Sequence, residues 1–230
     1  MSFHKHHRAR FADPMEFITR AINKLNTLWL CRTYPFASVG TRLFVHYTAE
    51  IERRIAHRIK LGNLVSLNRH VWLNVSAVED DGEPVIILED GCAIGHRTTI
   101  SAKNCIHLER NVITAQSVLI MDHSHAYEDV KLPIRAQGTS SGGRIRIGQG
   151  SWIGHGAAIV CTKGELILGN NCVVAANALV TRSFPPYSVV SGNPARVVKQ
   201  FDPIRNTWVL GSIKPMESEA SKPELALHAS

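Results

Sequence analysis

The segment MDHSHAYEDV, residues 121–130, places two histidines and three acids within ten positions, directly after a run of regularly spaced aliphatic residues. Imidazole can act as a base while it is neutral near pH 7, and it is also the commonest protein ligand for metals. A neighbouring carboxylate can hold one tautomer of such a base. The residue types therefore fit a general base, a metal site shared with His96 and His155, or a polar loop without chemistry.

The chain around this segment repeats an aliphatic or small residue at every sixth position, with Thr114 as the one polar exception. The breaks in this period fall between triplets, which indicates that three steps of six make one closed unit. The positions are Leu61, Leu67, Leu73; Leu88, Ile94, Ile100; Leu108, Thr114, Ile120; Ile147, Ile153, Ile159; and Leu168, Val174, Val180.

A period of six fits neither an α-helix nor a simple hairpin sheet. It does fit a coil of three short flat strands, in which each sixth side chain points inward and stacks on its counterpart about 4.8 Å away in the next coil. Glycines that follow several of these positions, such as Gly62 and Gly148, suit the corners. The pattern predicts an all-β solenoid of parallel strands.

The opening segment lies where this repeat is interrupted. From Ile120 to Ile147 the chain advances 27 positions where a corner needs a few. A long excursion from a regular scaffold is uncommon and usually functional. We therefore expect an extended loop over residues 121–146 that carries the chemistry.

Two stretches of the repeat, IRIGQGSWIGHGAAIV and LILGNNCVVAANALVTRSFPPYSVVSGNPARVVKQF, resemble the hexapeptide-repeat acyltransferases. The resemblance covers roughly residues 60–200 and is closest to O-acetyltransferases of sugars and surface polysaccharides, of the maltose, galactoside and colanic-acid type. It implies a left-handed parallel β-helix and a homotrimer with a cleft between subunits. It also implies acetyl-CoA as the acyl donor, a saccharide acceptor from exopolysaccharide or lipopolysaccharide biosynthesis, and no metal.

The resemblance also implies roles for individual residues. His123 matches the general base that deprotonates the acceptor hydroxyl, a step that contributes about 10²- to 10⁴-fold to the rate. Asp122, His125 and Tyr127 are candidates for acceptor binding, and one of the flanking acids is expected to orient His123. The candidates for coenzyme A binding are Trp152, Gly154, His155 and Ala176 along the pantetheine arm, and Arg182, Arg196 and Lys199 at the phosphates.

One departure concerns the acceptor. The maltose and galactoside enzymes carry an asparagine at a position that falls on Gly95 here, which argues against a simple free sugar. Three other functions stay open: N-acetylation of an amino sugar, a non-catalytic solenoid scaffold, and a metal-dependent hydratase like the γ-carbonic anhydrases. The last requires an HxxxxH spacing that this sequence lacks.

Composition narrows the class of partner. The net charge of +7 arises within residues 1–60, which hold 11 Lys/Arg against 4 Asp/Glu, whereas the remainder holds 15 of each. This distribution and the 7% aromatic content argue against a nucleic-acid binder. With no apolar run of roughly 18 residues and no secretory signal, we expect a cytoplasmic protein.

The two ends flank the repeat domain, predicted over residues 59–200. Residues 1–58 form a basic segment with an amphipathic helix over about 14–31, with Asp13 as N-cap. Its apolar stripe is expected to pack on the open end of the coil, and the alternative is peripheral contact with a membrane. Residues 79–85 are expected to form a turn and residues 201–230 a largely disordered tail. The stripe comprises Met15, Ile18, Ala21, Ile22, Leu25, Leu28 and Trp29.

Overall fold

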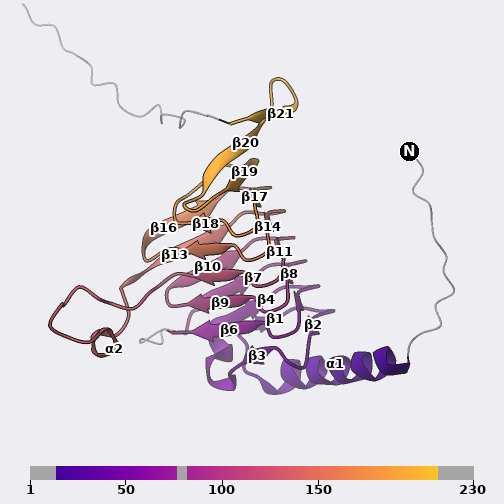
Figure 1. The fold of residues 1–230 in the computed structure, drawn as a ribbon. Coiled ribbons are helices and arrows are strands. Elements are labelled where there is room, and N and C mark those ends of the chain that lie inside the picture. The colour runs from indigo at the N-terminus through magenta and orange to yellow at the C-terminus, as the bar shows by residue number, and fades with distance from the viewer. Residues whose placement is uncertain (1–13, 77–81, 212–230) are drawn as a thin grey trace, which may run out of the picture.

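The computed structural model describes residues 14–76 and 82–211, in which the chain winds as a coil of short strands that form a three-sided prism (Figure 1). Each coil contributes one strand to each of three sheets, and strands of successive coils pair in parallel. The first sheet comprises β1 (Ser38–Val39), β4 (Ile59–Leu61), β7 (Ile86–Leu88), β10 (Cys105–Leu108), β13 (Gly142–Ile147) and β16 (Lys163–Leu168). The predicted solenoid is confirmed.

The other two sheets follow the same order along the prism. The second comprises β2 (Phe44–Val45), β5 (Ser66–Leu67), β8 (Ala93–Ile94), β11 (Ile113–Thr114), β14 (Trp152–Ile153), β17 (Val173–Val174), β19 (Ser188–Ser191), β20 (Arg196–Asp202) and β21 (Thr207–Leu210). The third comprises β3 (Glu50–Ile51), β6 (Trp72–Val75), β9 (Thr99–Ala102), β12 (Leu119–Met121), β15 (Ala158–Val160) and β18 (Leu179–Val180).

The core is the stack of inward side chains that the six-residue period predicts. All fifteen predicted positions are buried, and most are completely inaccessible. Burial of each leucine, isoleucine or valine contributes about 1.5–3 kcal/mol, so this stack supplies the main driving force for folding. The polar exception is satisfied inside the core, because Thr114 Oγ1 accepts the Gly95 N–H at 2.8 Å and lies 3.3 Å from the hydroxyl of Thr98.

The solenoid extends beyond the range expected at both ends. A first coil precedes Leu61, with Val39, Val45 and Ile51 pointing inward at the same spacing of six. A 3₁₀ helix, Arg53–Arg58, then links it to β4 and obscures the repeat in the sequence. The repeat domain therefore begins near residue 38 rather than 59.

The structure describes the C-terminal end as far as Gly211. Strands β20 and β21 form an antiparallel hairpin on the last parallel strand of the second sheet, β19. This hairpin covers an edge whose backbone groups would otherwise lack partners. Residues 201–210, expected in a disordered tail, thus belong to the fold. The rest of that prediction, residues 212–230, lies outside the described residues, as do the proposed N-cap Asp13 and part of the turn at 79–85.

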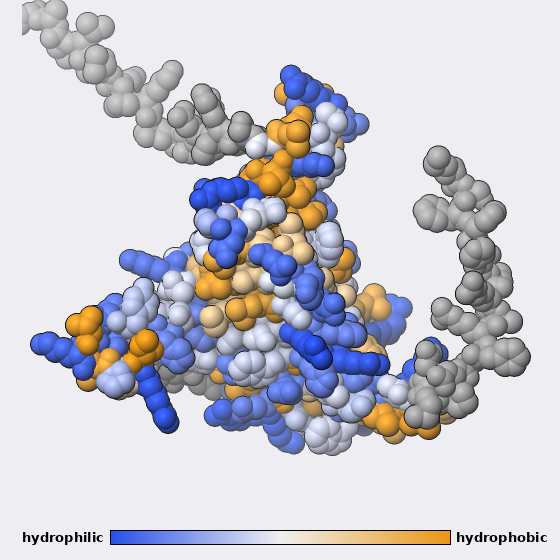
Figure 2. Space-filling view, viewed as in Figure 1, coloured by the Kyte–Doolittle hydropathy of each residue, from blue (hydrophilic) through white to orange (hydrophobic). Residues whose placement is uncertain are grey.

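The predicted amphipathic helix is confirmed as α1 (Pro14–Thr33), which lies across the base of the prism (Figure 1). The expected packing of its apolar stripe is wrong. Within the described residues the stripe faces outward, with Leu25 67% and Trp29 54% exposed, and Figure 2 shows hydrophobic residues at the surface of this helix. The helix contacts the coil through the opposite face, which carries Asn23 and Thr27.

Hydrogen bonding explains this orientation. The end of the coil presents the unpaired backbone of β2, and buried N–H and C=O groups need partners. Thr27 Oγ1 accepts the Val45 N–H at 3.0 Å and lies 3.2 Å from the Val45 carbonyl oxygen, while Asn23 Oδ1 accepts the Tyr47 N–H at 3.0 Å. Polar side chains therefore cap the first coil, and the apolar stripe remains free of the core.

Candidate active site

The long loop leaves the prism at the corner where the third sheet turns into the first sheet of the next coil. We call this the loop corner and define it by Lys103, Asp122 and His123. The register of β9 with β12 places Lys103 and His123 at equivalent positions of successive coils. The loop then runs out sideways, carries the short helix α2 (Ile134–Gln137), and returns at β13 (Figure 1). The extended loop expected from the break in the repeat is confirmed.

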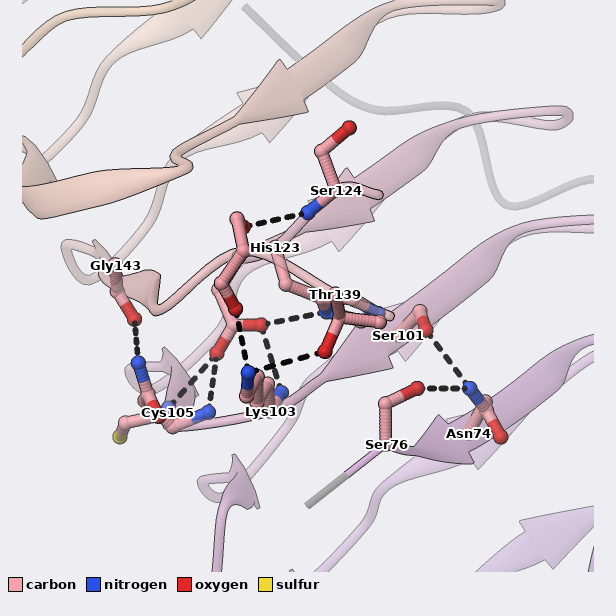
Figure 3. Close-up of polar contacts among 12 residues, drawn as sticks. Asn74, Ser76, Ser101, Lys103, Cys105, His123, Ser124, Thr139 and Gly143 are labelled. Carbon is pink, nitrogen blue, oxygen red and sulfur yellow. Dashed lines mark hydrogen bonds and ion pairs between the residues drawn. The ribbon is translucent and has the colours of Figure 1, made fainter. Parts of the chain in front are cut away.

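Asp122 is the centre of the loop corner. Its side chain is completely buried, and its carboxylate accepts backbone N–H groups of Lys103, Asn104 and Cys105 at 2.7, 2.8 and 2.9 Å. Three such donors compensate the cost of burying a charge, so the carboxylate is held in one orientation. Figure 3 shows the hydrogen bonds around Lys103, Cys105 and His123.

His123 is held by this carboxylate. Its Nδ1 lies 3.0 Å from Asp122 Oδ1, and the ring is only 7% exposed. A carboxylate beside Nδ1 favours the tautomer with the proton on Nδ1, which leaves the lone pair on Nε2 to accept a proton. The sequence could not choose among the flanking acids, and the geometry selects Asp122. Asp122 is therefore placed to orient His123 rather than to contact an acceptor, because its oxygens are buried and already bonded.

The base of the loop is tied to the same corner. Ser124 N donates to Ser140 Oγ at 3.1 Å, and Ser140 N donates to the Ser124 carbonyl at 2.7 Å. Lys103 Nζ donates to Thr139 Oγ1 at 3.0 Å and also to the Ser140 carbonyl (Figure 3). Where the chain rejoins the coil, Gly143 N donates to the Asp122 carbonyl at 2.6 Å. Both strands of the loop are thus fastened beside His123.

The other two loop candidates lie further out. His125 pairs with Thr139 in an isolated antiparallel bridge and lines a pocket of about 400 Å³ with Ile134 and Arg135. Tyr127 is 67% exposed. These two residues share the projecting arm of the loop, whereas His123 and Asp122 belong to the coil.

The structure distributes the predicted donor-binding residues over several surfaces. Gly154, His155 and Ala176 lie at the corner between the second and third sheets, and Trp152 lies on the outer face of the second sheet. Arg182 occupies the column of Asp122, two coils further on, with its guanidinium 5.1 Å from the ring centroid of Phe184. Arg196 and Lys199 belong to β20. A single chain therefore places the pantetheine candidates and His123 on different corners.

A polar cluster near the loop corner was not predicted. Asn74 Nδ2 donates to Ser76 Oγ at 3.1 Å and to Ser101 Oγ at 2.9 Å, on the third sheet beside the site (Figure 3). The register could have indicated it, because Ser76 and Lys103 hold the same position in their coils as His123. Ser76 thus lies in the column below the candidate base.

The thiol of Cys105, whose backbone N–H donates to Asp122, is not suited to nucleophilic catalysis. Burial raises the pKa of the Cys105 thiol, so it is a neutral thiol at pH 7 and a poor nucleophile. A Cβ at Gly95 would lie 2.1 Å from the carbonyl oxygen of Ala115. No asparagine fits there, which gives a physical reason for the departure noted in the sequence.

In the part of the chain that the structure describes, no three His, Cys, Asp or Glu side chains are placed to hold a metal ion together. Its longest helix, α1, and the other helices are each too short or too polar to cross a membrane.

The fold and the repeat together define a left-handed parallel β-helix with hexapeptide repeats. An N-acyltransferase from Bacillus cereus, AntD, solved in complex with dTDP and 3-hydroxybutyryl-CoA, superposes with a TM-score of 0.59 at 16% identity, over 79% of this chain and 87% of that one. At this identity the match concerns the fold. No family model matches the chain.

Curated relatives are similar in sequence. A Mycobacterium tuberculosis protein named as an acetyltransferase is 28% identical over 162 residues, which are 70% of this chain and 49% of that protein. An Escherichia coli protein named as a lipopolysaccharide biosynthesis O-acetyl transferase is 26% identical over 55% of this chain and 66% of its own length. The chain thus spans about half the length of the first relative and two thirds of the second.

Proposed function

We propose that this protein transfers an acetyl group from acetyl-CoA to a hydroxyl of a saccharide, in the biosynthesis of a surface polysaccharide or lipopolysaccharide. The observation that carries the proposal is the buried Asp122–His123 pair at the foot of an extended loop. The names of the curated relatives support acetyl transfer, and the E. coli relative supports a hydroxyl as the acceptor group.

The chemistry follows from the tautomer. His123 Nε2 accepts the proton of the acceptor hydroxyl as its oxygen attacks the thioester carbonyl carbon. The tetrahedral intermediate collapses with cleavage of the C–S bond, and the proton passes from the imidazolium to the departing thiolate. Asp122 stabilises the imidazolium that forms transiently, and no covalent acyl-enzyme is required.

The assembly we propose is a homotrimer. Since Gly154, His155 and Ala176 lie on a different corner from His123, a neighbouring subunit must supply one of the two to complete the site. Trp152, which is 46% exposed, would line this interface, and Arg182, Arg196 and Lys199 would meet the phosphates of coenzyme A.

The test is release of free thiol from acetyl-CoA in the presence of mono- and oligosaccharides, amino sugars and sugar nucleotides. The wild type should show acceptor-dependent turnover, and His123→Ala should lower kcat by about 10²- to 10⁴-fold with little change in the KM for acetyl-CoA. His107→Ala is the matched control, because that ring lies on β10 in the first sheet and pairs with Glu89. Turnover with amino sugars alone would favour N-acetylation, and full activity of His123→Ala would refute the mechanism.

We assign α1 to the surface of an anionic membrane. Its outward stripe includes Leu25, Leu28 and Trp29, and basic residues flank it at Lys24 and Arg32, which are also exposed. A helix with one apolar face and basic neighbours lies in the interface of anionic bilayers. The sequence that leads into the helix adds Lys5, Arg8 and Arg10.

Co-sedimentation with vesicles tests this assignment. The protein should bind vesicles that contain phosphatidylglycerol more tightly than pure phosphatidylcholine, and Leu25→Gln combined with Trp29→Gln should abolish binding without loss of thiol release on soluble acceptors. If the double variant changes the oligomeric state and binding is absent in the wild type, the stripe covers a neighbouring subunit and the membrane assignment fails.

A further inference from the structure

The corner between the second and third sheets carries a group of basic side chains on the first coils, which we call the basic corner: His46, Arg69, His70, His96 and Arg97. The register of β5 with β8 places Arg69 and His96 at equivalent positions of successive coils, and His70 and Arg97 at the next position. The Arg97 N–H donates to the Arg69 carbonyl at 2.9 Å, which fixes the two turns against each other. Four exposed basic side chains thus form two columns along the prism. Within each column, the backbones of the two coils are about 4.8 Å apart.

This corner has no acidic residue to balance it. The equivalent turn positions in the coils above and below are occupied by Tyr47, Thr48, Gln116 and Ser117, none of which carries a negative charge. By contrast, the corner between the first and second sheets carries Glu89, Asp90 and Glu109 at its turns. The charge at the basic corner is therefore uncompensated within these turns.

A buried imidazole adds a second, independent observation. His46 is only 5% exposed, and its Nδ1 accepts the Thr48 N–H at 3.2 Å and lies 2.9 Å from the Thr48 hydroxyl. Because Nδ1 accepts a hydrogen bond, the proton of the neutral ring is on Nε2. That Nε2 is buried and has no hydrogen-bond partner among the described residues. An unpaired buried donor is costly, so an acceptor supplied by a ligand would stabilise it.

The electrostatic environment of His46 links it to the exposed group. Burial lowers the pKa of His46, and the positive charges of Arg69, His70 and His96 lower it further. Three of the four exposed residues of the corner therefore act on this ring. A negatively charged ligand at the corner would relieve both the repulsion and the unpaired Nε2 donor.

We propose that the basic corner binds a phosphate or diphosphate group on the saccharide acceptor. The columns of this corner continue upward through His155 and Ala176, so the phosphate would lie below the pantetheine arm along the same corner. The inference rests on the proposed acetyl transfer for the identity of the ligand as an acceptor. Arginine pairs with phosphate oxygens in a bidentate manner, which suits this chemistry better than a neutral sugar.

The phosphate on the acceptor has two chemical sources, a lipid carrier and a nucleotide. The basic corner would bind the phosphate of either in the same way. The lowest part of the basic corner adjoins α1, because Asn23 Oδ1 accepts the Tyr47 N–H at 3.0 Å. A phosphate on a membrane-anchored saccharide would thus enter from the base of the prism. A sugar nucleotide would supply the same group from solution.

Binding of inorganic pyrophosphate, measured by calorimetry on the full chain, tests the corner without any turnover. Arg69→Gln combined with Arg97→Gln should weaken binding by roughly tenfold for each arginine, since hydrogen bonds to charged groups are the strong ones. The matched control is Lys60→Gln combined with Arg110→Gln, which removes two exposed cations from other surfaces. Equal loss in both double variants, or no binding by the wild type, overturns the proposal.

The second arm is steady-state kinetics. The Arg69/Arg97 variant should raise the KM for saccharides linked through a diphosphate, to a short lipid or to a nucleoside, and leave the KM for acetyl-CoA unchanged. Preference between these two acceptors identifies the source of the phosphate. A raised KM for acetyl-CoA instead would show that the corner holds the donor, and this part of the inference would be wrong. If pyrophosphate binds but no saccharide is acetylated, the proposed function fails while the anion site stands.

Discussion

The loop corner and the basic corner lie at turns of the same solenoid and are built in opposite ways. At the loop corner the Asp122 carboxylate has three N–H donors and a histidine, so its charge is balanced and its geometry is fixed. At the basic corner positive groups repel one another and a buried His46 donor lacks a partner among the described residues. The first arrangement suits a group that must be in place before the substrate arrives. The second suits a group that the substrate completes.

The largest effect is expected from Asp122→Asn, which removes the negative charge at the loop corner. The amide NH₂ would face backbone N–H donors, so we expect a loss of stability of about 1–3 kcal/mol. We also expect kcat to fall by roughly 10²-fold, because the His123 tautomer is no longer imposed. Thermal unfolding and the pH dependence of kcat measure the two effects.

The control for this variant is Asp129→Asn, which changes an exposed carboxylate on the projecting arm of the loop. If Asp122 positions His123, the acidic limb of the pH profile of kcat should shift in Asp122→Asn and stay in place in Asp129→Asn. If the folded Asp122→Asn protein keeps the wild-type kcat and pH profile, Asp122 serves stability alone.

A smaller effect is expected below the basic corner, where α1 supports the first coil. Thr27→Val keeps the shape of the side chain but removes the hydroxyl that contacts both backbone groups of Val45. We expect a destabilisation of about 1–2 kcal/mol, with pyrophosphate binding also weakened. Thr33→Val, which loses a single exposed bond to the Trp29 carbonyl, should change stability less. Equal effects in denaturant titrations would contradict the capping role of the polar face.

The smallest expected effect is the dependence of stability on pH at His46. Its pKa is lower in the folded protein than in the unfolded chain, so the unfolded chain binds more protons once the pH falls below about 6.5. Stability is therefore unaffected by this group above that pH and declines as the pH falls further. His46→Asn should reduce this loss of stability between pH 7.5 and 5.5. Pyrophosphate should reduce the same loss of stability in the wild-type protein. If the pH dependence of stability is unchanged in His46→Asn and also with pyrophosphate, the assigned tautomer and charge of His46 are wrong.

The solenoid could be predicted from sequence because its inward positions repeat strictly every six residues. The first coil could not be predicted from this period, because the 3₁₀ helix Arg53–Arg58 places Ile51 ten positions before the next inward residue, Leu61. The loop was predicted for the same reason that the coils were, since it is the longest interruption of the period. The C-terminal hairpin has no such period, and its role as an edge cover is visible only in three dimensions.

The details of the site could not be read in the same way. The choice of Asp122 as partner of His123 depends on backbone donors at Lys103, Asn104 and Cys105, which lie in the preceding coil and leave no trace in residue type. The orientation of α1 was predicted wrongly because hydropathy assigns apolar stripes to cores. The end of this coil presents hydrogen-bonding groups, and these select Thr27 and Asn23 instead.

Under the proposed function, the even stacking of the coils would also determine which sugar unit can react. Arg69 and Arg97 lie on the second and third coils, and His123 lies on the fourth, so their heights differ by roughly 5–10 Å at about 4.8 Å per coil. In a trimer whose threefold axis runs along the prism, this difference is the same between neighbouring subunits. A phosphate fixed at one height then brings only nearby hydroxyls level with the imidazole. The spacing of the coils would thus restrict acetylation to the sugar next to the phosphate, whatever the length of the glycan beyond it.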